Sequence, residues 1–215
     1  MEYRVIFRQK HIQIGIVFFL FIAAFLLGPI AQSNFMAMMP GDLGDARLNN
    51  YFLENIYQFF AGRNDSLWNL GFFCPFPYVS GFSDNLFGAS PIYLLARIIS
   101  HSPDTAFQIW YLFGYFANFL AAYYALRKLG NSWLASAIGA LIFSFALPVT
   151  VKSNHAQLHY RFGAPLAITM FILFLENKDW RRFILAAAWL VWQFYCTIYI
   201  GFFTLLMLAT ILTIF

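Results

Sequence analysis

Runs of apolar residues are the feature that most constrains what this chain can fold into. The first run, residues 12–31, follows Arg4, Arg8 and Lys10. A helix needs about 20 apolar residues to cross the hydrocarbon core of a bilayer. A secretory signal peptide also has a basic start, but its apolar region is only about 7–15 residues long. The length of this run therefore favours an uncleaved transmembrane helix.

Five further apolar segments predict five further spans. They occupy residues 105–126, 133–151, 158–176, 183–197 and 201–215. The last two could also be one long helix, but a weakly polar interruption at residues 197–201 favours two. Charged residues make up only 10% of the chain, against about 25% in a soluble domain. We therefore expect an all-α, polytopic membrane protein with about six transmembrane helices.

Charge and cysteine content exclude other classes of protein. The net charge of +4 comes from basic residues scattered in short groups, which does not indicate a nucleic-acid partner. Cys74 and Cys196 form neither a disulfide framework nor a metal-type spacing. The chain ends inside an apolar run, so we expect it to be the N-terminal part of a longer protein. Nothing in the sequence indicates an oligomeric state.

The short loops predict how the chain is oriented in the membrane. "RKLGN" at 127–131 and "NKDWRR" at 177–182 are both basic, and cytoplasmic loops carry an excess of Lys and Arg. This places the N-terminus in the cytoplasm and the protein in the cytoplasmic (inner) membrane, with membrane lipid around it. Residues 32–104 then form one long outer loop, which is too apolar to be a solvated linker.

Two helices are expected on the membrane surface within this outer loop. The first covers residues 42–61, with Leu48, Phe52, Leu53, Ile56, Phe59 and Phe60 on one arc of its helical wheel and Arg47, Asn50, Glu54, Asn55 and Gln58 on the other. The second covers residues 91–100, with Ser90 as its N-cap and Pro91 at its first position.

The first outer helix begins with two acids. Asp42, Asp45 and Asn49 lie on its apolar arc at spacing i, i+3, i+7. A carboxylate facing the membrane body would be desolvated, and its pKa should rise toward the range of a general base. The alternative is structural: Asp42 as an N-cap, and Asp45 at N3 near the positive end of the helix dipole.

A second outer loop carries cations and histidines. Residues 151–161 hold Lys152, His155, His159 and Arg161, which together supply the charge and donors that a phosphate group needs. If the segment is helical, both histidines share one face. The alternatives are snorkelling for the cations and metal or haem ligation for the histidines, although no third ligand is near. Asp84, in the first outer loop, is either a second acid of the site or part of a turn.

The topology and the motif "GDLGDAR" at 41–47 resemble those of the GT-C integral-membrane glycosyltransferases, in particular the YfhO-like and protein-mannosyltransferase-like members. The resemblance implies a polyprenyl-phosphate-linked sugar as donor and an acceptor on the outer side of the membrane. It further implies that Asp45 or Asp42 is the catalytic base, or binds the acceptor or a divalent metal, with Asp45 preferred. The adjacent acid pair of the mannosyltransferases is absent, since Leu43 and Gly44 separate the two acids.

Two other functions fit a chain of this kind. A transporter or flippase of lipid-linked saccharides would carry acids within its spans, whereas here no acid lies in the interior of an apolar run. A non-catalytic membrane scaffold would leave the acid pair without a role. The sequence does not identify the sugar, the acceptor or a metal requirement, and no cofactor is certain.

Overall fold

The computed structural model describes residues 2–41, 44–146 and 155–215, with side chains from residue 11 onward. This part of the chain is all-helical, as predicted, and contains eight α-helices. Its long helices are α1 (Glu2–Phe25), which continues in a π-helical turn (Leu26–Ile30), α4 (Pro103–Lys128), α5 (Trp133–Phe145), α7 (Gly163–Asn177), α8 (Trp180–Cys196) and α9 (Ile198–Ile214).

Two of the described helical segments are long and apolar enough to cross a membrane: His11–Ile30 and Ala156–Asn177. Helices α5 and α9 are apolar but shorter. The predicted six spans therefore remain a prediction, although each expected segment contains a helix. The predicted break near residue 197 is present, because Thr197 has an extended backbone between α8 and α9.

Local sequence explains where several helices begin. The side chains of Ser102 and Ser132 accept hydrogen bonds from the backbone N–H groups of Thr105 and Ala135, at the starts of α4 and α5. Asp179 accepts one from Arg181 at the start of α8. Each side chain satisfies an N–H group that has no partner within its helix.

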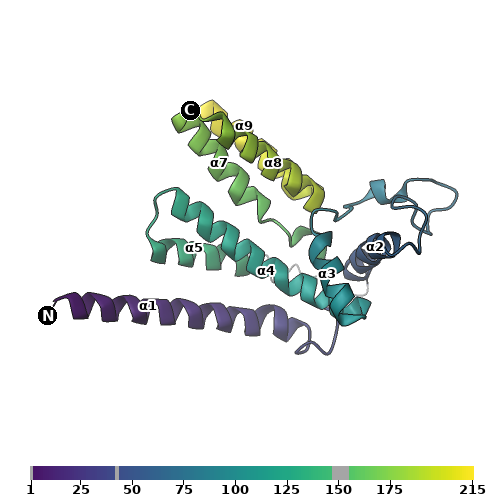
Figure 1. The fold of residues 1–215 in the computed structure, drawn as a ribbon, viewed down its shortest axis with the longest axis horizontal. Coiled ribbons are helices and arrows are strands. Elements are labelled where there is room, and N and C mark those ends of the chain that lie inside the picture. Colours follow the sequence, from purple (N-terminus) through teal and green to yellow (C-terminus); the bar gives the residue numbers. More distant parts are fainter. Residues whose placement is uncertain (1, 42–43, 147–154) are drawn as a thin grey trace.

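The long helices run between two ends of the molecule, and the outer loop gathers at one of them. Figure 1 shows α2 and α3 with their connecting loop at one end, and both termini and the α4–α5 turn at the other. Helix α4 packs against α3, α5 and α7, while α7, α8 and α9 pack together. This arrangement separates the polar outer segments from the short basic loops.

Both predicted outer helices are present with shifted starts. Helix α2 spans Asp45–Phe60 and begins three residues later than expected, and α3 spans Ser90–Ser100 and begins one residue earlier. Ser90 is therefore the first residue of α3 and not its N-cap.

The wheel of α2 is only partly right. Phe52, Leu53 and Ile56 are buried as expected, but Asn50 and Asn55 on the opposite arc are buried too. Helix α2 is thus covered by other parts of the protein on more than one side, and its polar arc does not simply face solvent.

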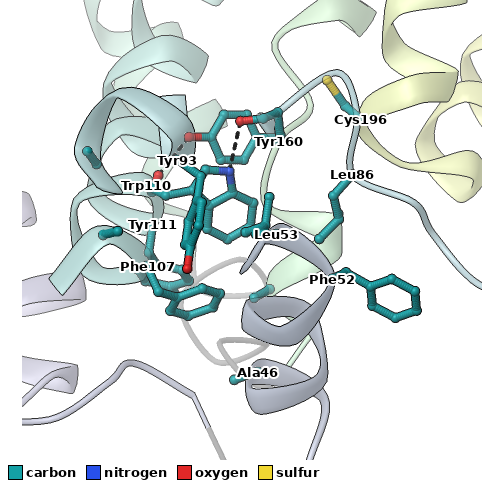
Figure 2. Packing of buried hydrophobic residues seen from close by; sticks show 14 of the residues in the cluster. Ala46, Phe52, Leu53, Leu86, Tyr93, Phe107, Trp110, Tyr111, Tyr160 and Cys196 are labelled. Carbon is teal, nitrogen blue, oxygen red and sulfur yellow. Dashed lines mark hydrogen bonds between the residues drawn. The ribbon is translucent and has the colours of Figure 1, made fainter. Parts of the chain in front are cut away.

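The main core joins the outer helices to α4. Trp110 of α4 is fully buried and stacks on Tyr160, with ring centroids 4.7 Å apart. Its indole N–H donates to the Ala89 carbonyl, 3.0 Å away, beside α3. Figure 2 shows Leu53 of α2 and Tyr93 of α3 packed around these rings. The outer helices are therefore fixed to the bundle by buried aromatic side chains.

Candidate functional site

Asp45 lies at the start of α2 and faces the second outer loop. Gly44 is the N-cap residue and makes no side-chain cap bond, so Asp45 is the first residue of the helix and not the third. The predicted N-cap, Asp42, lies outside the described residues. Asp45 still lies at the positive end of the helix, where a negative charge is favourable.

Two side-chain pairs join α2 to this second loop. The Asp45 Oδ2 atom lies 2.7 Å from Nδ1 of His155, which is 110 residues further along the chain. One turn along α2, the Asn49 amide donates to the Gln157 Oε1 atom at 2.8 Å. Asp45 and Asn49 lie one helical turn apart on α2, and their partners His155 and Gln157 lie two residues apart on the loop. The two pairs therefore lie side by side between the same two segments.

The acid–histidine pair is open to solvent. The side chains of Asp45 and His155 are 45% and 42% exposed. The expectation that Asp45 is desolvated is therefore wrong: α2 begins at the edge of the bundle, where its first turn is only partly covered. A substrate group could reach this pair without any rearrangement of the core.

The chemistry of the pair fixes the tautomer of His155. An ionised carboxylate only accepts hydrogen bonds, so Nδ1 must carry the proton that is donated to Asp45. In the neutral ring Nε2 then keeps its lone pair and can accept a proton. Asp45 thus orients a potential base, as the acid of a catalytic triad does.

The backbone that follows His155 is held by three hydrogen bonds from two helices. Asn118 of α4 donates to the His159 carbonyl at 2.8 Å, and its Oδ1 accepts the N–H of Arg161 at 3.2 Å. Gln193 of α8 donates to the Tyr160 carbonyl at 2.8 Å. These bonds fix residues 159–161, which follow His155 by four to six positions, to the bundle.

His159 is buried and lies apart from His155. The intervening residues form a short 3-10 helix (Ala156–Leu158), so the two histidines do not share a face as expected for an α-helix. The His159 Nε2–H donates to the Tyr111 carbonyl at 2.9 Å, and the side chain is almost fully covered. His159 therefore pins the loop to α4, and its predicted contact with substrate phosphate does not fit this position.

Gly114 of α4 makes room for the His159 ring. A Cβ atom built at Gly114 would lie 2.4 Å from His159 Cδ2 and 2.5 Å from Nε2. Because contacts this short do not occur between real side chains, any larger residue would push the histidine away from α4.

Arg161 is a mostly buried cation. One terminal nitrogen donates to the Phe143 carbonyl at 2.7 Å, in the last turn of α5, where the helix dipole is negative. Its Nε atom is buried and has no hydrogen-bond partner. Among the side chains that the structure describes, no carboxylate is paired with Arg161. Within the described residues, its charge therefore has no carboxylate partner, and its Nε–H has no acceptor.

Asp84 lies in a different part of the fold and is buried. Its Oδ1 accepts the N–H of Ile198 at 2.6 Å, at the start of α9. Burial raises the pKa of the Asp84 carboxyl, against the opposing effect of that hydrogen bond. Asp84 therefore ties the outer loop to the α8–α9 corner, and the prediction that it binds substrate does not fit this position.

Other predicted site residues and groups are described only in part. Lys152 lies outside the described residues. In the part of the chain that the structure covers, no three His, Cys, Asp or Glu side chains are grouped to hold a metal ion. Of the predicted set, Asp45, Asn49 and His155 come together in one place.

Sequence reasoning missed two residues that shape the site, Asn118 and Gln193. Both are fully buried amides within apolar runs, and polar side chains within a span usually make specific contacts there. That rule could have identified both amides as residues with specific contacts, but it could not have identified the groups that they contact.

Comparison of the chain with protein-family models, with curated proteins and with solved structures gave no match. The class of protein is therefore defined by fold and site alone. Its described residues form an all-helical bundle with two membrane-length helices and a solvent-accessible acid–histidine pair at one end.

Proposed function

We propose that this chain is part of a membrane glycosyltransferase of the GT-C type. It would transfer a sugar from a polyprenyl-phosphate-linked donor to an acceptor on the outer side of the cytoplasmic membrane. The observation that carries the proposal is the Asp45–His155 pair, which joins the two outer segments at 2.7 Å and is open to solvent.

The arrangement of the helices supports six spans. Each of the six expected segments holds a helix, and α1, α4, α5, α7, α8 and α9 extend away from the end that carries α2 and α3 (Figure 1). In this proposal α5 and α9, which are short, cross a thinned or locally adapted bilayer, as short spans do.

The pair supplies the base that the transfer needs. Nε2 of His155 takes the proton of the acceptor hydroxyl, while Asp45 holds the ring and stabilises the imidazolium that forms. The acceptor oxygen bonds to the anomeric carbon as the bond from that carbon to the phosphate oxygen breaks. Polyprenyl phosphate leaves with the bonding electron pair. The base is thus the pair as a unit, and Asp45 acts through His155.

The leaving phosphate requires positive charge and donors rather than an acid. Arg161 can supply both, because its side chain is not fully buried and no described carboxylate is paired with it. It follows His155 by six residues on the same segment. We therefore assign Arg161 to the donor phosphate.

Transfer by single-residue variants tests the proposal. The protein is reconstituted in proteoliposomes and given polyprenyl-phosphate-linked hexoses. We expect Asp45→Asn and His155→Gln each to lower turnover by about 10²–10⁴, the usual worth of a general base. The double variant should be no slower than the worse single one, because the two residues act as one unit.

Asp65→Asn is the matched control, because Asp65 is an exposed acid in the same loop. It should transfer sugar like the parent. Turnover that is unchanged in both pair variants, at normal protein levels, would show that the pair is structural. Movement of the lipid-linked sugar across the bilayer without transfer would favour the flippase alternative.

A further inference from the structure

An open apolar groove lies between α1, α4 and α5, at the end of the bundle away from the candidate site. Its volume is about 670 Å³. Helix α1 contributes Val17, Phe18 and Phe21, and α4 contributes Phe119 and Leu120. Apart from Arg127, every residue that lines it is apolar or aromatic. Such a lining fits a hydrocarbon chain.

The groove has one charged end. Arg127 lies in the last turn of α4 and donates to the Asn131 carbonyl at 2.8 Å through one terminal nitrogen. No carboxylate is paired with it among the side chains from residue 11 onward that the structure describes. Trp133, which also lines the groove, is of a residue type that favours the membrane–water interface. The remaining guanidinium donors of Arg127 are thus available to an anion.

The length of the groove matches one leaflet of a bilayer. From Phe116 to Arg127, α4 rises about 16 Å, and half of a hydrocarbon core is about 15 Å. An acyl chain that fills the groove would therefore bring its phosphate to the level of Arg127. Basic pockets between membrane helices are known to bind anionic head groups.

We propose that this groove binds an anionic phospholipid from the leaflet that faces the N-terminus. One acyl chain lies between α1 and α4, and the phosphate pairs with Arg127. The site is independent of the proposed transfer chemistry, because it lies at the opposite end of α4 from the acid–histidine pair.

Native mass spectrometry of the purified chain tests this site. The protein is released from micelles that contain equal amounts of phosphatidylglycerol and phosphatidylcholine with identical acyl chains. We expect retained phosphatidylglycerol to exceed phosphatidylcholine. Arg127→Gln should reduce that preference about fivefold, the factor that corresponds to about 1 kcal/mol for one basic residue at a membrane surface.

Two further variants distinguish binding in this groove from nonspecific attraction of lipid to the protein surface. Lys128→Gln removes the neighbouring charge, whose ammonium lies over the Tyr124 ring and outside the groove, and it should leave the preference unchanged. Leu120→Trp fills the groove without a change in charge and should reduce retention of both lipids.

Three results would overturn the proposal. The first is equal losses in the Arg127 and Lys128 variants, which would show diffuse surface attraction only. The second is unchanged lipid retention in Leu120→Trp. The third is a lipid-free dimer that Leu120→Trp converts to a monomer, which would show that a second copy fills the groove.

Discussion

Two histidines of the same loop show how local surroundings decide the role of a residue. His155 is half exposed and meets a carboxylate, whereas His159 is buried against α4 and meets a backbone carbonyl. Only the first can exchange a proton with a substrate. The second serves to hold the loop, in the space that Gly114 leaves.

Asp84 supports a prediction about pH at the residue scale. Its pKa is raised in the folded chain, mainly by burial, so ionisation costs more free energy in the folded state than in the unfolded state. The contribution of Asp84 to the free energy of unfolding should therefore be highest below the ordinary carboxyl pKa of about 3.9 and fall as pH rises from there through the folded-state pKa. Asp84→Asn removes this dependence and keeps an acceptor for the Ile198 N–H.

Thermal unfolding in detergent from pH 4 to 8 measures this effect. The midpoint of Asp84→Asn should gain on that of the parent as pH rises. Asp84→Ala should be less stable than Asp84→Asn by about 1–3 kcal/mol, since the Ile198 N–H loses its partner. A midpoint of Asp84→Asn that falls relative to that of the parent as pH rises would contradict the assignment.

At the scale of elements, α2 and α3 are joined by a mostly buried ion pair. Arg97 Nε donates to Glu54 Oε2 at 2.9 Å, with the two side chains only 11% and 19% exposed. The Tyr93 hydroxyl donates to the same carboxylate at 2.8 Å. Burial and this carboxylate keep the pKa of Tyr93 well above its usual value. Glu54 therefore accepts hydrogen bonds from two side chains of α3 at once.

Glu54→Gln should loosen the contact between these helices. It removes the negative charge that faces the Arg97 guanidinium and weakens the hydrogen bonds from Tyr93 and Arg97, at a cost of about 1–3 kcal/mol in the free energy of unfolding. For a chain of this length, each kcal/mol lowers the melting temperature by about 2–4 °C.

Glu176→Gln is the control for this variant, because Glu176 is exposed at the end of α7 and makes no described ion pair. It should melt with the parent. If both glutamine variants melt alike, the ion pair contributes nothing to the docking of α2.

At the scale of the whole molecule, the two ends of the bundle differ in chemistry. One end carries α2, α3 and the candidate site, and the other carries both termini (Figure 1). Arg127 and Lys128 lie in the last turn of α4, next to the turn at that second end. Short basic turns at one end are what the positive-inside rule predicts for a cytoplasmic face.

Cysteine labelling tests this orientation. The native Cys74 is exposed in the outer loop, while Cys196 is buried. We expect a membrane-impermeant maleimide to label Cys74 in intact cells. In a Cys74→Ser background, a cysteine placed at Asn64 should be labelled, and one placed at Gly130 should be labelled only after the membrane is opened. The reverse pattern would place the N-terminus outside.

The sequence by itself determined the elements, because the forces that form helices act over a few residues. Apolar runs located all the long helices. Ser102, Ser132 and Asp179 set helix starts through bonds to N–H groups two or three residues away. The break at Thr197 and the two outer helices were also predicted within a few residues.

Only the tertiary structure decided which side chains meet. Asp45 and His155 are 110 residues apart, and nothing local encodes their distance. The wheel of α2 failed at Asn50 and Asn55, because α3, α4 and the loop bury a face that the wheel assigned to water. Burial depends on what packs against a residue, and its packing partners here come from distant segments. For that reason the candidate acids were visible in the sequence, whereas their pairing, exposure and use were not.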